Sequence, residues 1–82
     1  MAIKILVLDR GWVLVGNCFD GKDEILLKEG STILRWGTKE GLGELAKNGK
    51  LENTILNAFN EDVLINKKYI MMTIECNQDK WS

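Results

Sequence analysis

The segment from Arg35 to Ala46 gathers the side chains in this sequence that are best suited to bind a ligand. An arginine, a tryptophan, a threonine and a lysine surround the start of a predicted helix there: Arg35, Trp36, Thr38 and Lys39. Free N–H groups at a helix start, beside a guanidinium, attract anions, and a tryptophan can stack on a planar base. The segment predicts a site for a nucleotide-like anion, with Arg10 and Trp12 as second contributors.

The same residues also have a purely structural interpretation, which remains open at this point. Thr38 can simply cap the helix, Trp36 can belong to the core, and Arg35 and Lys39 can be solvated. Residues 41–46 also match the dinucleotide-binding pattern G-x-G-x-x-A, with Glu61 twenty residues beyond its first glycine. That pattern needs a strand–helix–strand unit in a larger parallel sheet, so we interpret the match as accidental.

Residues suited to catalysis are scarce. The chain has no histidine, and its two cysteines do not form a C-x-x-C pair, so neither histidine-assisted catalysis nor a zinc site is expected. The remaining acidic candidates stand at predicted turns, where carboxylates are normally solvated: Asp20, Asp23, Glu24, Glu61 and Asp62. We therefore expect a protein that is not an enzyme and that uses no cofactor and no metal.

Composition and charge favour one folded domain over residues 1–82. Hydrophobic residues make up 45% of the chain and charged residues 28%, and the formal net charge is −1, which is too balanced for a disordered chain. The basic surplus that is typical of nucleic-acid binding is missing, and the densest basic group is Lys67-Lys68. Nucleic acid is therefore not expected as a partner.

The N-terminus and the cysteines indicate a cytoplasmic protein. The apolar run Ile3–Leu8 is too short for a signal-peptide core or a membrane span. Cys18 and Cys76 lie far apart, each within an apolar stretch, so we expect two buried free thiols, with a disulfide as the alternative.

Strand and turn patterns dominate the first 36 residues. Aliphatic and aromatic residues fill four extended stretches, and turn residues such as Asp20-Gly21 and Glu29-Gly30-Ser31 separate them. The predicted strands cover residues 3–8, 12–19, 24–29 and 32–36. They predict a four-stranded antiparallel meander.

The pattern then changes to a helix and returns to strands. Leu42, Leu45 and Ala46 share a helical face, and Asn48-Gly49 supplies a stop, so a short helix over about 38–48 is expected. Further extended pieces begin at residue 54, at residue 62 and at residue 69, and the last one runs to Cys76 with Ile70, Met72 and Ile74 on its core face. The tail is polar apart from Trp81. The fold class is mainly β (α+β), with a small meander or barrel-like sheet and one short helix.

Several of these strands are apolar on both faces. Ile3, Ile5 and Val7 alternate with other aliphatic residues, and the stretch from Trp12 to Phe19 does the same. One small sheet with one helix cannot cover that much apolar surface, so we expect a homo-oligomer. A monomeric barrel with a helix is the alternative.

The chain resembles a group of short uncharacterised bacteriophage proteins that carry an R-W-G-T…G-L-G-E-L-A segment. The resemblance rests on Arg35–Ala46, with Asp9–Val13 before it and Ile74–Cys76 and Lys80-Trp81 after it. It implies a phage origin, and hence the host-cell cytoplasm. One class of small phage proteins sequesters nucleotide signals of bacterial immunity, and this analogy favours an anti-defence sponge. A protein-interaction or structural accessory module is the alternative, and a carboxylate hydrolase is a third hypothesis.

Overall fold

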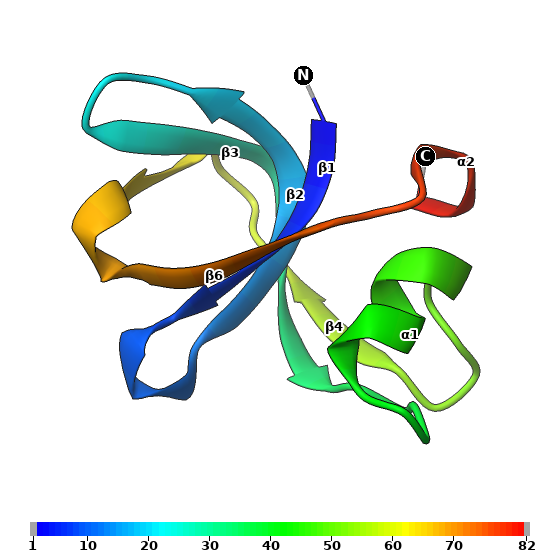
Figure 1. The fold of residues 1–82 in the computed structure, drawn as a ribbon. Helices are drawn as coiled ribbons and strands as arrows, with labels where there is room; N and C mark the ends of the chain where they lie inside the picture. The colour runs from blue at the N-terminus through cyan, green and yellow to red at the C-terminus, as the bar shows by residue number, and fades with distance from the viewer. Residues whose placement is uncertain (1, 82) are drawn as a thin grey trace.

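The protein folds as one six-stranded antiparallel sheet with two short helices (Figure 1). The computed structural model describes residues 2–81. The strands are β1 (Ala2–Leu8), β2 (Val13–Asp20), β3 (Glu24–Arg35), β4 (Ile55–Ala58), β5 (Val63–Asn66) and β6 (Ile70–Glu75). The helices are α1 (Leu42–Asn48) and α2 (Gln78–Trp81), and single 3-10 turns η1 (Asp9–Gly11) and η2 (Lys67–Tyr69) join strands. The predicted mainly β fold class is confirmed.

The strands follow the order β4-β3-β2-β1-β6, and β5 also pairs with β3. β4 lies along the second half of β3, where Ser31 is opposite Ala58, and β5 lies along the first half, where Ile25 is opposite Ile65. The long β3 therefore organises the sheet, which curls but stays open.

The predicted turn at residues 29–31 is wrong. β3 is a single strand of twelve residues instead of two strands, so the meander has three strands rather than four. In its pairing with β2, Asn17 is opposite Lys28 while Val15 is opposite Ser31, which leaves one extra residue in β3. Glu29 there has a φ of 50°. The turn-type residues Glu29 and Gly30 thus form a β-bulge, which bends the strand without reversing it.

Because of this bulge, the two halves of β3 pack into two different hydrophobic clusters. Ile25 and Leu27, before it, belong to a second cluster, whereas Ile33, after it, belongs to a first cluster. An extra residue reverses which face the following side chains occupy, because side chains alternate along a strand. One strand therefore contributes to apolar packing on both faces of the sheet.

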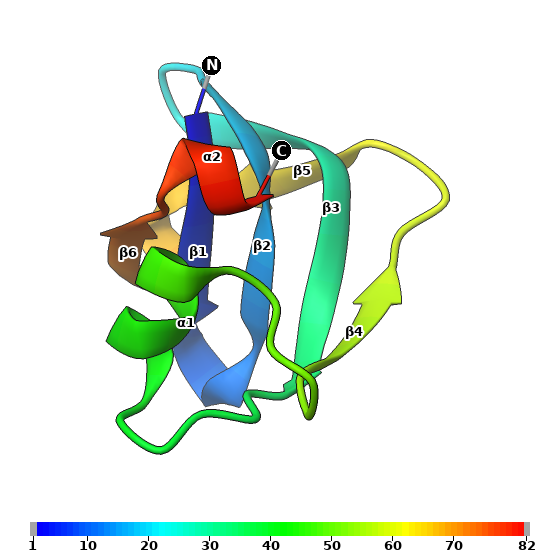
Figure 2. The same ribbon diagram turned by 90° about the vertical axis from the view of Figure 1, so that its right-hand side faces the viewer.

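Each face of the sheet is covered by the chain itself (Figure 2). Both helices lie on the side of the first cluster, whose buried members are Ile3, Ile5, Val13, Val15, Ile33, Leu45, Ala46 and Cys76. The second cluster comprises Leu6, Leu14, Cys18, Ile25, Leu27 and Ile65, and Phe59 packs on it. Most apolar side chains on both faces of these strands are thus buried within one chain, while Trp12 and Phe19 stay exposed.

Helix α1 is shorter than predicted. It begins at Leu42, because the Thr38 hydroxyl accepts a hydrogen bond from the Gly41 N–H (3.1 Å) and closes a turn ahead of the helix. The predicted stop is confirmed: Gly49 has a φ of 83° and its N–H donates to the Leu45 carbonyl at 2.9 Å. Leu45 and Ala46 are buried, as the predicted apolar face requires.

The C-terminal region departs from the prediction in two ways. Met72, expected in the core, is 55% exposed, because it lies on the edge strand β6, where it pairs with Val7 next to a register shift. The polar tail, to which no element was assigned, forms the short helix α2, from which Trp81 packs on the first cluster. Within residues 2–81, no helix is both long and apolar enough to cross a membrane.

Candidate functional site

The four residues of the predicted anion site lie together on the connection between β3 and α1. Arg35 ends β3 and is exposed, Trp36 is 43% exposed, and Lys39 is exposed. The Trp36 carbonyl accepts a hydrogen bond from the Thr54 hydroxyl (2.7 Å), and the Thr38 hydroxyl is already bonded to the Gly41 N–H.

The four residues lie apart from three cavities in the part of the chain that the structure describes, because Arg35, Trp36, Thr38 and Lys39 line none of these three. Of the two second contributors, Arg10 is exposed in η1, while Trp12 lines a cavity with a different set of residues. The six predicted residues thus do not share any of these three cavities, and their role in binding a ligand stays a prediction.

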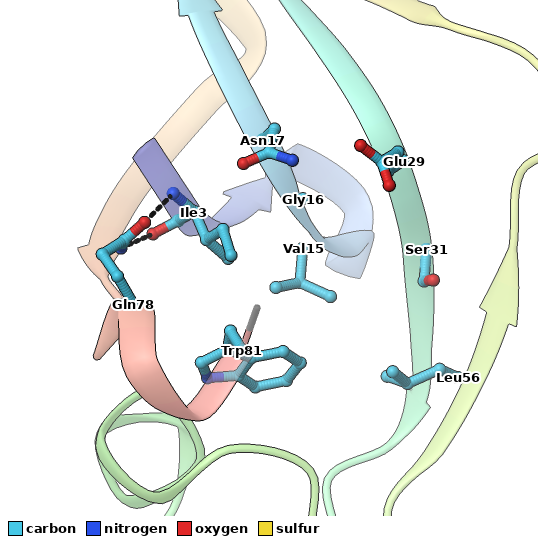
Figure 3. A pocket seen from close by; sticks show the side chains of 9 residues that line it. All are labelled: Ile3, Val15, Gly16, Asn17, Glu29, Ser31, Leu56, Gln78 and Trp81. Carbon is cyan, nitrogen blue, oxygen red and sulfur yellow. Dashed lines mark hydrogen bonds between the residues drawn. The ribbon is translucent and has the colours of Figure 1, made fainter. Parts of the chain in front are cut away.

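A cavity of about 490 Å³ lies between the sheet and α2 (Figure 3). We call it the strand–helix pocket. Its lining comes from four strands and one helix: Ile3, Val15, Gly16, Asn17, Glu29, Ser31, Leu56, Gln78 and Trp81. A volume of this size is in the range of small-molecule sites.

The apolar wall of this pocket includes the indole of Trp81. The indole N–H donates to the carbonyls of Leu45 and Ala46, both at 3.2 Å, at the end of α1. These two bonds fix the plane of the ring. Val15 and Leu56 lie near the ring in the same pocket (Figure 3). The pocket thus has a flat, preorganised surface on which a planar molecule can stack.

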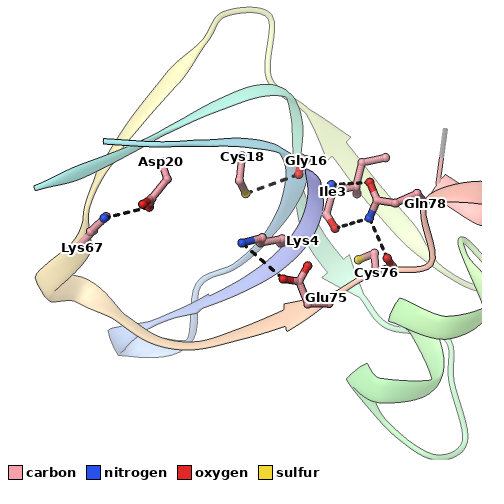
Figure 4. A network of polar contacts seen from close by, with 9 residues as sticks. All are labelled: Ile3, Lys4, Gly16, Cys18, Asp20, Lys67, Glu75, Cys76 and Gln78. Atoms are coloured by element: carbon pink, nitrogen blue, oxygen red, sulfur yellow. Dashed lines mark hydrogen bonds and ion pairs between the residues drawn. The ribbon is translucent and has the colours of Figure 1, made fainter. Parts of the chain in front are cut away.

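Gln78 holds the helix that carries this tryptophan. Its amide oxygen accepts a hydrogen bond from the Ile3 N–H at 2.8 Å. Its amide nitrogen donates to the carbonyls of Ile3 (3.0 Å) and Cys76 (2.7 Å) (Figure 4). The side chain is committed to the backbone of β1 and of the segment after β6, and it anchors α2 against the sheet edge.

Three other polar side chains line the pocket and are open to solvent, since Glu29 is exposed and Asn17 and Ser31 are half-buried. Asn17, Glu29 and Ser31 line it, and within residues 2–81 none of their side chains takes part in a hydrogen bond or ion pair. Together they offer a carboxylate, an amide and a hydroxyl. Figure 3 shows Asn17 and Glu29 on neighbouring strands above the tryptophan.

The charge of the pocket is negative. Glu29 is the one charged residue among those that line it. A carboxylate at a partly apolar site favours cations and N–H donors and disfavours anions. The strand–helix pocket is therefore suited to a neutral or positively charged ligand.

The ionisable groups whose pKa values are shifted lie outside the strand–helix pocket. Burial raises the pKa of both thiols, to about 11 for Cys76, and the charge of Lys4 opposes this rise in the pKa of Cys18. Both cysteines are free and buried, as predicted. The Lys67 ammonium, 2.9 Å from Asp20, lowers the pKa of that carboxyl (Figure 4). Within residues 2–81, no group of three histidine, cysteine or acidic residues could hold a metal ion.

Sequence reasoning missed the residues of the strand–helix pocket. It assigned Glu29 and Ser31 to a turn and gave Asn17 no functional role. The one available signal was Trp81, an isolated large apolar residue in a polar tail.

The chain matches no protein-family model, and it matches no curated protein.

Proposed function

We propose that this protein is a non-catalytic binding protein that holds a small planar molecule in the strand–helix pocket. One observation carries the proposal: a fixed indole wall lies beside three polar side chains that have no partner within residues 2–81. Ligand sites commonly combine an apolar surface with a few convergent polar groups. A binding role follows from that combination.

The class of ligand follows from the chemistry of the Trp81 indole and of the polar side chains that line the pocket. Trp81 offers a face for stacking, and the Glu29 carboxylate can accept two N–H donors side by side. Asn17 can both donate and accept. A heteroaromatic molecule with adjacent N–H donors, such as a nucleobase or a nucleoside, satisfies all three groups.

The absence of catalysis is part of the proposal. Glu29 is the one acidic or basic side chain in the lining, and the chain has no histidine to activate the Ser31 hydroxyl. The pocket thus lacks the pair of groups that general acid–base or nucleophilic catalysis uses. Such a protein acts by retaining its ligand.

Sequestration of a nucleotide-like signal stays a prediction, but its proposed site is now the strand–helix pocket instead of the segment around Arg35. The anionic ligand expected near Arg35 would need a basic cavity, and the strand–helix pocket is acidic. A base or nucleoside part fits the pocket, whereas a phosphate beside Glu29 would be repelled. The phage origin and an anti-defence role rest on the sequence resemblance alone.

Thermal melting with two ligand panels tests the proposal. One panel holds neutral nucleobases and nucleosides, and the other holds nucleoside monophosphates, cyclic dinucleotides and ADP-ribose. We expect a member of the neutral panel to stabilise the fold, by about 2.7 kcal/mol at a hundred times its dissociation constant. Glu29→Gln keeps the shape of the side chain and removes its charge, so this variant should lose most of the effect.

Glu52→Gln serves as the matched control, because Glu52 is exposed and lines none of the three cavities. This variant should respond to the ligand as the wild type does. A failure of every neutral compound to shift the melt would contradict the proposal. A larger shift from the anionic panel, lost in Arg35→Lys and kept in Glu29→Gln, would restore the site predicted from the sequence.

A further inference from the structure

A second cavity, of about 450 Å³, lies between the β1–β2 turn and β5, away from the strand–helix pocket. We propose that it binds a short extended peptide of another protein, in which a basic residue stands next to apolar ones. We call it the aromatic groove, after Trp12 and Tyr69, which line it with Leu64. This inference is independent of the function proposed above.

Large apolar side chains are left in solvent at this groove. Trp12 is 59% exposed, Leu64 62% and Tyr69 47%. They come from the turn after β1, from β5 and from η2, and they converge on one cavity. Exposed apolar groups that share a hollow typically mark a binding surface, because scattered ones would need no explanation.

The backbone presents these side chains on fixed turns. The Leu8 N–H donates to the Trp12 carbonyl at 2.8 Å, which closes the turn that carries the indole. The Asn66 side chain accepts a hydrogen bond from the Lys68 N–H (3.1 Å) and caps η2, which carries Tyr69. A groove with ordered walls binds an extended peptide with little further loss of entropy.

Two carboxylates on the lining of the groove favour a basic ligand, although the Lys68 ammonium lies at its rim. Asp9 and Glu24 are the charged residues among those that line it. The Tyr69 ring already attracts a cation, since the Lys68 ammonium lies 5.1 Å from its centre. An arginine in a bound peptide can reach the two carboxylates or replace that lysine over the ring, while leucine or proline side chains contact Trp12 and Leu64.

Binding of a synthetic peptide library, followed by NMR, tests this inference. The library varies the positions of one arginine among leucine and proline residues, and a parallel library carries citrulline, which is uncharged, in place of arginine. We expect an arginine peptide to shift the indole signal of Trp12 and the amide signals of Leu64 and Tyr69. The indole signal of Trp81 should stay unchanged, because its N–H is bonded inside the protein.

Variants separate the groove from the rest of the surface. Trp12→Ala and Leu64→Ser should each weaken binding at least tenfold, and the matched changes Trp36→Ala and Leu34→Ser, at residues exposed outside the groove, should not. Asp9→Asn combined with Glu24→Gln should abolish the preference for arginine over citrulline. Melting curves identify any variant that fails to fold.

Three results would overturn the inference. The first is that no member of the arginine library binds at millimolar concentration. The second is that the arginine and citrulline libraries bind equally well. The third is that Trp12→Ala converts a dimer to a monomer in sedimentation, because the groove would then be an interface between copies of this chain.

Discussion

Glu29 has a backbone conformation that glutamate seldom adopts. Its φ of 50° lies in the left-handed region, where a side chain with a Cβ costs about 1–2 kcal/mol. The residue stands at the bulge of β3 and on the rim of the strand–helix pocket. Strain of this kind commonly accompanies function, because a glycine or asparagine would satisfy the backbone at lower cost. The backbone of Glu29 and its place on the pocket support the proposal that its carboxylate binds a ligand.

Replacing Glu29 by asparagine should therefore stabilise the fold. Asparagine tolerates the left-handed region, so Glu29→Asn should raise the free energy of unfolding by about 0.5–1 kcal/mol in urea denaturation. Glu29→Ala keeps a Cβ and its strain, and it should give no such gain. An equal gain in both variants would mean that the charge, and not the backbone, destabilises the wild type.

The thiol of Cys76 makes stability depend on alkaline pH. Burial raises its pKa from 9.0 to about 11, so the folded state keeps a proton that the unfolded chain loses. The contribution is present in full below pH 9 and is lost as the pH rises through 11, an effect of roughly 2–3 kcal/mol. Urea titrations near pH 8 and near pH 11 should show a steeper loss in wild type than in Cys76→Ala. Identical losses would show that the Cys76 thiol does not cause the decline.

Among the elements, the bulge in β3 depends on a close approach of two glycines. A Cβ on Gly16 would lie 2.8 Å from the Cα of Gly30 and 3.1 Å from the carbonyl oxygen of Lys28. A contact with backbone atoms cannot be relieved by a rotamer change, so β2 or β3 would have to move. Gly16 thus lets the two strands pack where β3 bends.

Gly16→Ala should lower the free energy of unfolding by about 1–3 kcal/mol. The control is Gly43→Ala in α1, where a Cβ meets no atom within 4 Å. That change should raise the free energy of unfolding by about 0.5–1 kcal/mol, because alanine favours a helix more than glycine does. Guanidinium denaturation measures both effects, and a neutral Gly16→Ala would show that the strands separate easily at this point.

The sequence predicted most of the strands and helices but not the bulge in β3 or the pocket that forms between distant segments. The strands and the stop at Gly49 follow from local patterns, which a single segment is enough to specify. Glu29 and Gly30 have the composition of a turn and of a bulge alike, and only the pairing with β2 distinguishes the two. The pocket escaped prediction because it joins residues as distant as Ile3 and Trp81, and no spacing pattern links them.

At the scale of the whole molecule, the homo-oligomer stays a prediction, but it now rests on a smaller set of exposed apolar side chains. The two apolar faces that motivated it are covered by α1, α2 and the curled sheet of the same chain. What remains exposed is a smaller set of side chains, such as Leu34, Ile55 and Met71. Sedimentation velocity at micromolar concentration measures the outcome. We expect a dimer or larger species, and a species of 9.3 kDa alone would contradict it.

The pairing of β1 with β6 has a consequence for how the chain acquires its fold. β1 is an interior strand, yet one of its two neighbours is the last strand of the sheet, and Ile3 is bonded to Gln78 across 75 positions of sequence. Such contacts close the longest loop in the chain and form slowly, on a scale of about milliseconds to seconds. During synthesis one edge of β1 stays unpaired until β6 has also emerged. The nascent protein therefore passes through a stage in which that edge is open to chaperones or to neighbouring chains.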